Sequence, residues 1–109
     1  MGNRKLAGAL LAASLFLLAG CQEKAGGRVH RIEMKGMAFA PAELTVARGD
    51  TVVWANRDIV PHTATAAARQ FDSGSVSPGA EWSLVAREPG RIAYTCTFHP
   101  TMKAVLVVK

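Results

Sequence analysis

The chain has 109 residues, half of them apolar, with 13 lysine and arginine side chains against 8 aspartate and glutamate side chains. This length allows one domain. The positive surplus contains no lysine or arginine run and no basic stretch interleaved with aromatic residues, so we expect no binding to nucleic acid.

The N-terminal residues have the order of an export signal. Asn3, Arg4 and Lys5 precede an apolar segment, residues 6–19, that contains no charged side chain. A helix needs about 20 residues to span a bilayer, and this segment is shorter. Small residues follow it, as they do in export signals.

The signal ends in Leu-Ala-Gly-Cys at 18–21, which resembles the lipobox of bacterial lipoproteins. The resemblance implies that Cys21 is lipidated and anchors the mature protein to a bacterial membrane, in the periplasm or on the outer cell surface. Ordinary secretion and an uncleaved anchor are the alternatives. We expect residues 1–20 to be the signal peptide, 21–27 the lipidated cysteine with a flexible tether, and 28–109 the folded domain.

The folded domain has the pattern of an all-β protein. Turn signals such as Arg48-Gly49-Asp50 recur about every ten residues, which predicts a β-sandwich or barrel. Apolar residues alternate between the turns, as in Ile92, Tyr94 and Cys96. We expect strands at 29–35, 42–47, 51–56, 62–67, 80–86, 91–96 and 103–108. The segment 64–68 fits either a frayed strand or a short helical turn.

Three potential metal ligands lie in one predicted turn. Cys96 ends a strand, His99 follows three residues later and Met102 three after that, with Pro100 restricting the loop. A thiolate, an imidazole and a thioether at this spacing can close around one ion. With Cys21 lipidated, Cys96 has no disulfide partner in an oxidising compartment, where an unprotected thiol is a chemical liability.

The fourth ligand should be a histidine from another loop. His62 follows Pro61 at the end of a turn, whereas His30 lies in mid-strand between Arg28 and Arg31. We therefore expect His62 to be the ligand and His30 to be a partly exposed histidine without a function.

These ligand types predict a copper site. Two imidazoles and a thiolate with a weak axial methionine make the blue-copper arrangement, which suits electron transfer. Zinc would favour more thiolates or a set without a thioether. A nucleophilic pair of Cys96 and His99 would leave Met102 and His62 unused.

The domain as a whole resembles the cupredoxins, most closely the group that contains amicyanin and plastocyanin. The gaps on both sides of His99 resemble the short amicyanin loop. The resemblance implies an eight-stranded Greek-key β-sandwich with one copper ion near one end, held by His62, Cys96 and His99 in a plane and by Met102 axially. The segments that carry it are Met-Ala-Phe-Ala-Pro at 37–41, Arg-Gly-Asp-Thr-Val-Val-Trp-Ala-Asn at 48–56, Pro-His-Thr at 61–63, Phe-Asp-Ser-Gly at 71–74 and Gly-Arg-Ile-Ala-Tyr-Thr-Cys at 90–96.

The resemblance also implies that His99 lies near the surface and passes electrons to redox protein partners. We expect them to dock on an apolar patch formed by Pro61, Phe98 and Pro100. Met37 and Phe39 can either join this patch or fill the core, and we expect the core.

The chain departs from this family at two places. Thr63 and Thr97 stand where many relatives use an asparagine to tie the first histidine loop to the residue after the cysteine, which leaves the rigidity of the loops open. The backbone N–H of Thr63 can still bond the Cys96 sulfur. Phe98 stands where amicyanins have proline, which removes a constraint and adds apolar surface.

Together these features predict a monomeric, membrane-tethered carrier of single electrons without substrate chemistry of its own. The alternative is a lipoprotein that sequesters or delivers copper, although outside the signal only Met34 and Met37 accompany Met102. An oxidase with a trinuclear copper site would need more than the three histidines present.

Overall fold

The computed structural model describes Gly2 and residues 26–109. The expected signal peptide, the lipidated Cys21 and most of the tether therefore lie outside the described residues. Within the described part, no helix is long and apolar enough to cross a membrane.

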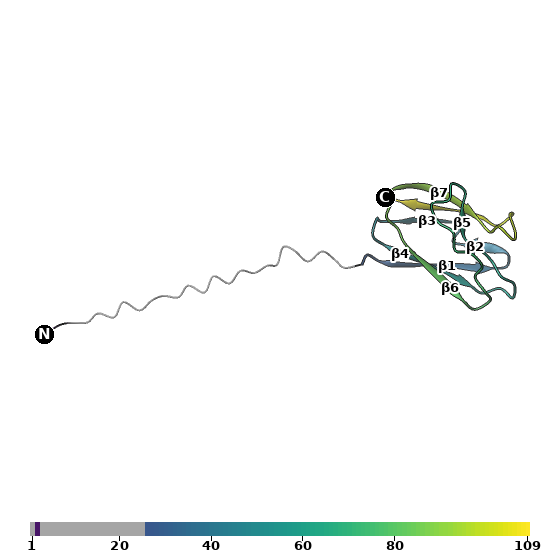
Figure 1. The fold of residues 1–109 in the computed structure, drawn as a ribbon, viewed down its shortest axis with the longest axis horizontal. Helices are drawn as coiled ribbons and strands as arrows, with labels where there is room; N and C mark the ends of the chain where they lie inside the picture. Colours follow the sequence, from purple (N-terminus) through teal and green to yellow (C-terminus); the bar gives the residue numbers. More distant parts are fainter. Residues whose placement is uncertain (1, 3–25) are drawn as a thin grey trace.

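Residues 29–108 form eight strands in two four-stranded sheets that pack face to face (Figure 1). The first sheet has the order β2-β1-β4-β6 and the second the order β3-β8-β7-β5. This confirms the predicted all-β sandwich. The strands are β1 (Val29–Lys35), β2 (Ala38–Ala40), β3 (Glu43–Val46), β4 (Thr51–Asn56), β5 (Thr65–Ala66), β6 (Glu81–Val85), β7 (Gly90–Thr95) and β8 (Lys103–Val108).

The core lies between the inner faces of the two sheets. Alternation places every second side chain of β1, β7 and β8 inside, which accounts for the buried Ile32, Tyr94 and Leu106. Trp54 of β4 packs edge-on against Tyr94 with ring centroids 5.6 Å apart. Phe39 contacts the same tyrosine at 4.8 Å, as expected for a core residue.

The hairpin of β1 and β2 contains a strand that was not predicted. The expected strands do not include β2, which has only three residues. Gly36 and Met37 form the turn with positive φ angles of 62° and 58°, the conformation that suits tight two-residue hairpins. Met37 is 42% exposed, so its expected place in the core is wrong, because the turn holds it outside the sandwich.

The segment 64–68 contains parts of both expected structures. Thr65 and Ala66 form the short β5, and a turn follows directly. His62 lies outside this strand and pairs instead with Val76 in an isolated bridge, with backbone hydrogen bonds of 3.1 and 2.7 Å. The predicted strand is therefore too long at both ends.

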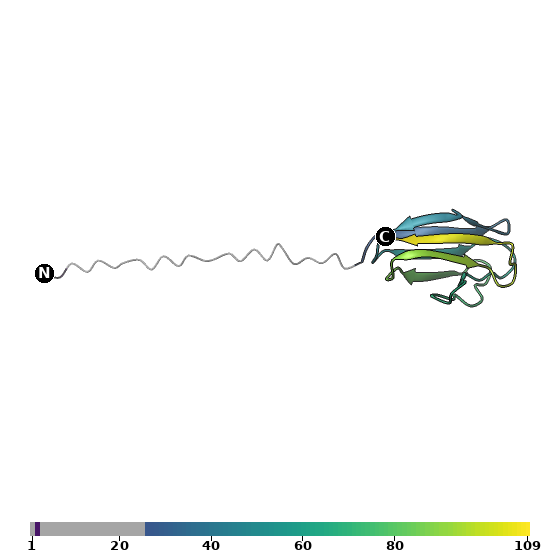
Figure 2. The ribbon, with the colours of Figure 1, turned by 90° about the horizontal axis from the view of Figure 1, so that it is seen from above.

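Strand directions define two ends of the sandwich. β1 runs parallel to β4 and β3 runs parallel to β8. The start of β1, the loops 47–50 and 86–89 and Lys109 lie together at one end, the tether end. The turn 36–37 and the loops 57–64 and 96–102 lie at the other, the loop end (Figure 2).

Candidate metal centre

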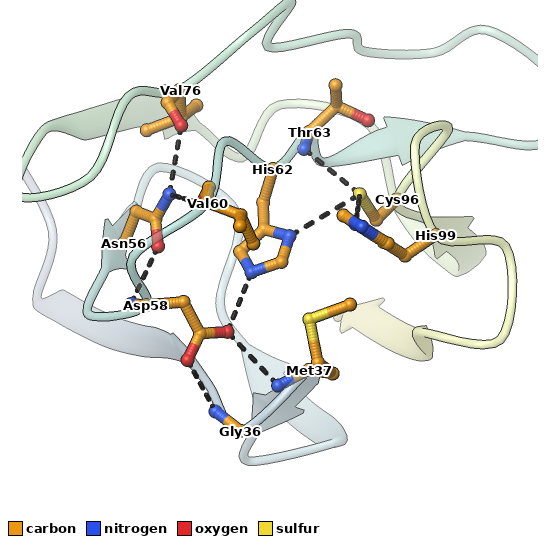
Figure 3. Close-up of polar contacts among 10 residues, drawn as sticks. All are labelled: Gly36, Met37, Asn56, Asp58, Val60, His62, Thr63, Val76, Cys96 and His99. Carbon is orange, nitrogen blue, oxygen red and sulfur yellow. Dashed lines mark hydrogen bonds and ion pairs between the residues drawn. The ribbon is translucent and has the colours of Figure 1, made fainter.

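Three of the predicted ligands meet at the loop end. Nδ1 of His62 lies 3.7 Å from Sγ of Cys96, and Nδ1 of His99 lies 3.8 Å from the same sulfur (Figure 3). All three donor atoms lie within 4.8 Å of one another. Within the part of the chain that the structure describes, no other group of three histidine, cysteine or acidic side chains gathers in this way.

These distances fit one metal ion. Bonds of about 2.1 Å to nitrogen and about 2.3 Å to sulfur, as in zinc sites, place the two atoms about 3.8 Å apart at an angle of about 120° and about 3.6 Å apart at the tetrahedral angle. The His99 distance matches the planar value, and the His62 distance lies midway between the two, so both are distances that one metal ion can span. A thiolate and two imidazoles in a trigonal set are the donors that copper takes in electron-transfer sites.

Met102 closes the loop on which Cys96 and His99 lie. The N–H of Met102 donates to the carbonyl of His99 (2.9 Å), and the N–H of Cys96 donates to the carbonyl of Met102 (3.1 Å). The Met102 side chain is buried, like that of Cys96. These backbone hydrogen bonds therefore join Met102 to the two residues that carry the other donors of the loop, and its side chain is shielded from solvent.

The four predicted ligands differ in access to solvent. Cys96, His62 and Met102 are buried, whereas His99 is partly exposed. His30 lies at the tether end, where its Nε2 is 2.9 Å from Oδ2 of Asp50. The structure thus brings together the three predicted donors His62, Cys96 and His99 and keeps His30 away from them.

Asp58 orients His62, and the sequence analysis missed this residue. Its Oδ2 lies 2.7 Å from Nε2 of His62 (Figure 3). With the carboxylate accepting the Nε2 proton, Nδ1 keeps its lone pair toward Cys96. Histidine ligands of metal sites commonly have such a carboxylate partner, which fixes the tautomer and the ring orientation.

The turn between β1 and β2 holds the Asp58 carboxylate. The N–H of Gly36 donates to Oδ1 (2.7 Å) and the N–H of Met37 donates to Oδ2 (3.0 Å). Two successive residues with positive φ aim both amides at one anion. Partial burial acts to raise the pKa of the Asp58 carboxyl, but the hydrogen bonds from His62, Met37 and Gly36 outweigh it and hold the pKa below its ordinary value of 3.8.

Asn56 fixes the loop that carries Asp58. Its buried side chain donates from Nδ2 to the carbonyls of Val60 (2.9 Å) and Val76 (3.0 Å), and its Oδ1 accepts the N–H of Asp58 (2.9 Å). The amide therefore satisfies three backbone groups at once. Asn56, at the end of β4, thus helps to fix the loop that carries Asp58 and joins it to Val76, the residue that pairs with His62.

Thr63 provides the link that the sequence left open. Its N–H donates to Sγ of Cys96 (3.3 Å), as predicted. Its Oγ1 accepts the N–H of Thr97 (2.8 Å) and hydrogen-bonds the hydroxyls of Thr97 (3.1 Å) and Thr65 (2.9 Å). The Thr63 side chain thus ties the two ligand loops together directly, through the backbone and the hydroxyl of Thr97.

Apolar side chains surround the exposed edge of the site. Phe98 is 52% exposed, and Pro61 and Pro100, the other members of the predicted patch, are exposed too. Met37 and Ile59, which is 95% exposed, extend the apolar surface on the loop end. Ile59 lies in a loop, so no alternating pattern in the sequence pointed to it.

Comparison with known proteins identifies the family of the domain. The model of the family described as Cupredoxin-like domain matches residues 8–108. The chain belongs to the cupredoxin-like family. Amicyanin from Paracoccus denitrificans is 32% identical over 88 residues, which cover 72% of this chain and 63% of the relative. Amicyanin-alpha from Methylorubrum extorquens is 30% identical over an alignment of 118 positions, which covers 93% of this chain and 92% of the relative.

Solved structures show the same fold. An amicyanin variant in its oxidised state superposes with a TM-score of 0.70 at 30% identity, covering 74% of this cupredoxin and 82% of the variant. A copper-containing nitrite reductase from Thermus scotoductus superposes with a TM-score of 0.69 at 26% identity over 73% of this chain, but only 22% of the reductase is covered. Related domains therefore occur both alone and inside larger enzymes.

Proposed function

We propose that this cupredoxin carries single electrons through one copper ion held by His62, Cys96, His99 and Met102. The observation that supports this most is the convergence of the His62 and His99 Nδ1 atoms on Sγ of Cys96, at 3.7 and 3.8 Å, distances that one metal ion can span. Bound copper would supply a reversible Cu(I)/Cu(II) couple, for which a thiolate, two imidazoles and a weak thioether are suited.

The protein's own contribution is to hold the donors in place. Asp58 keeps the Nδ1 lone pair of His62 directed at the site, and the Thr63 N–H hydrogen-bonds the Cys96 sulfur. The side chain of Thr63 joins the two loops that carry these ligands. Because the donors are positioned by bonds within the protein, little rearrangement accompanies a change of charge at the site, which favours fast electron transfer.

Electrons would leave through His99. Its ring is partly exposed and lies beside the apolar surface formed by Pro61, Phe98 and Pro100. Redox protein partners would dock there, and Met37 and Ile59 enlarge the area available to them. The protein would work as a monomer on a membrane, anchored through lipid at Cys21 in the periplasm or on the outer cell surface.

Titration of the mature chain with Cu(II) tests the copper site. We expect an intense blue absorption band that saturates at one copper per chain and vanishes in Cys96→Ser. Met102→Leu should keep the colour and raise the reduction potential, and His30→Ala should leave both unchanged. A folded wild-type protein without the band would refute the site.

Two further measurements test the remaining parts of the proposal. Reversible redox cycling at constant copper content is expected of a carrier, whereas transfer of the copper to an acceptor protein would favour copper delivery. Cys21→Ser should release the protein from membranes, and continued membrane association would show that an uncleaved signal holds it.

A further inference from the structure

The tether end of the domain carries arginines without acidic partners. Arg28, Arg48 and Arg87 are exposed, and no salt bridge within residues 26–109 includes any of them. Other arginines of the domain pair with glutamates. These pairs are Arg31 with Glu81, Arg57 with Glu33 and Arg91 with Glu43.

Backbone hydrogen bonds bring the three arginines to one surface. The N–H of Gly49 donates to the carbonyl of Ala86 (2.6 Å), which joins the loop of Arg48 to that of Arg87. The N–H of Gly27 donates to the carbonyl of Gly49 (3.1 Å), so Arg28 lies against the same loop. Three separate segments of the chain thus place their cations together.

Little negative charge opposes these cations. The Asp50 carboxylate is buried and accepts the N–H groups of Arg28 and Ala47 at 2.9 Å each, besides its contact with His30. The hydrogen bond with His30, helped by those from the backbone, holds the pKa of Asp50 below its ordinary value. Asp50 is therefore ionised, but its charge is buried and engaged by these donors. Glu88 is the exposed acidic side chain in these loops, against the exposed Arg28, Arg48, Arg87 and Lys109, so the side chains of the tether end carry a net positive charge.

The tether leaves the domain from the middle of this surface. A side chain on Gly27 would collide with Asp50, so glycine lets the chain pass close to the carboxylate. The carbonyl of Arg28 then accepts the N–H of Thr51 (2.8 Å) and fixes the start of β1. From Cys21 to Gly27 the extended chain reaches at most about 20 Å. A lipid on Cys21 would keep the tether end within that distance of the membrane.

We propose that the tether end docks on anionic phospholipid headgroups and holds the domain upright, with His99 turned away from the membrane. This rests on the proposed lipid anchor at Cys21. Each arginine near an anionic surface favours the docked state about fivefold, so three favour it about 100-fold. The seven residues of β1 span about 23 Å, so the loop end would stand clear of the lipid. Partners would then be water-soluble proteins or domains that protrude from the membrane.

Energy transfer between a dye on the domain and dyes on the lipid measures this orientation. The lipidated full chain carries the donor on a Thr101→Cys substitution at the exposed loop end, since the buried Cys96 does not compete for the label. Acceptors are attached to headgroups in vesicles of phosphatidylcholine, with or without phosphatidylglycerol. We expect weaker transfer on the anionic vesicles, and recovery of the neutral value at high salt.

Charge variants make the test specific. The combined variant Arg28→Gln, Arg48→Gln and Arg87→Gln should show the neutral-vesicle value on anionic vesicles. These exposed side chains lack partners, so the substitutions should leave folding intact. The matched control removes three cations from elsewhere on the domain and should behave like the wild type: Lys35→Gln, Arg69→Gln and Lys103→Gln.

The two proposals fail in different ways. If the chain stays on both kinds of vesicle and transfer is equal on them, or if the tether-end variant matches the wild type, the upright orientation is overturned while the anchor stands. If the wild type is lost from both kinds of vesicle, the anchor at Cys21 is overturned and the orientation with it.

Discussion

Replacing Asp58 with asparagine should disturb His62 without changing any ligand. The carboxylate accepts three hydrogen bonds, from Gly36, Met37 and His62, at 2.7, 3.0 and 2.7 Å. An amide of the same shape has one oxygen for these donors and turns an NH₂ group toward at least one of them. A charged hydrogen bond contributes about 1.5–3 kcal/mol, so the metal-free domain should lose stability in that range.

The lost charge should also raise the reduction potential. Oδ2 is 2.7 Å from Nε2 of His62. Adding the width of the imidazole ring and a metal–nitrogen bond places the carboxylate charge roughly 7 Å from a metal ion bound at Nδ1. At an effective dielectric constant of about 20, this separation corresponds to about 2 kcal/mol, or roughly 100 mV for one electron. The rise follows because the carboxylate stabilises the more positive Cu(II) state.

Three measurements check this prediction. Urea unfolding of the metal-free protein gives the loss of stability, voltammetry gives the potential, and the visible spectrum shows whether Cys96 still binds copper. Asp72→Asn is the matched control, because Asp72 is an exposed carboxylate that accepts bonds from Thr65 and Gly74. If Asp58→Asn changes neither stability nor potential relative to this control, Asp58 does not orient His62.

Three other substitutions probe the loops, the core and the patch. Thr63→Val leaves the N–H of Thr97 without its acceptor and should cost about 1–3 kcal/mol in urea unfolding and shift the copper band, while Thr63→Ser should restore both. Burial raises the pKa of Tyr94, the single tyrosine, to about 12. The unfolded chain releases this proton first, so stability should fall by roughly 2–3 kcal/mol between pH 10 and 12, and Tyr94→Phe should lack this share of the fall in alkaline unfolding. Phe98→Glu should slow electron self-exchange about tenfold, as measured by NMR line broadening, because like charges would meet where two copies touch. The copper band should not move. An unchanged rate would show that Phe98 does not belong to the docking surface.

The long strands were predictable because their side chains follow one rule. In β1 and β8 every second residue is buried, and the predicted bounds at 29–35 and 103–108 agree with the structure. β2 was not predicted and β5 was predicted too long, at 62–67, because two or three residues cannot display a period. Their positions depend instead on pairing. β2 pairs with β1 across a tight turn, and β5 pairs with β7, which is distant in sequence.

The sequence indicated the candidate donors and the hydrogen bond from the Thr63 N–H to the Cys96 sulfur, but it did not indicate Asp58. Cys96, His99 and Met102 are close in sequence, and their chemistry is distinctive. Asp58 gave no comparable signal, because an aspartate after a strand is ordinary turn composition. Its role comes from the turn at Gly36, which approaches only when the sandwich has formed.

The two ends of the domain use the same arrangement for different purposes. Asp50 accepts two backbone N–H groups and contacts Nε2 of His30, just as Asp58 accepts two backbone N–H groups and contacts Nε2 of His62. In both, a carboxylate with a lowered pKa joins segments at least 20 residues apart, because only a charged acceptor with several lone pairs can serve three donors. The two histidines differ in the surroundings of the other ring nitrogen. Nδ1 of His62 faces the Cys96 sulfur, whereas His30 belongs to no group of potential metal ligands among the described residues. A histidine held by an aspartate thus stabilises the fold in either place, and it gains a metal-binding role only where a thiolate and a second imidazole approach its free nitrogen.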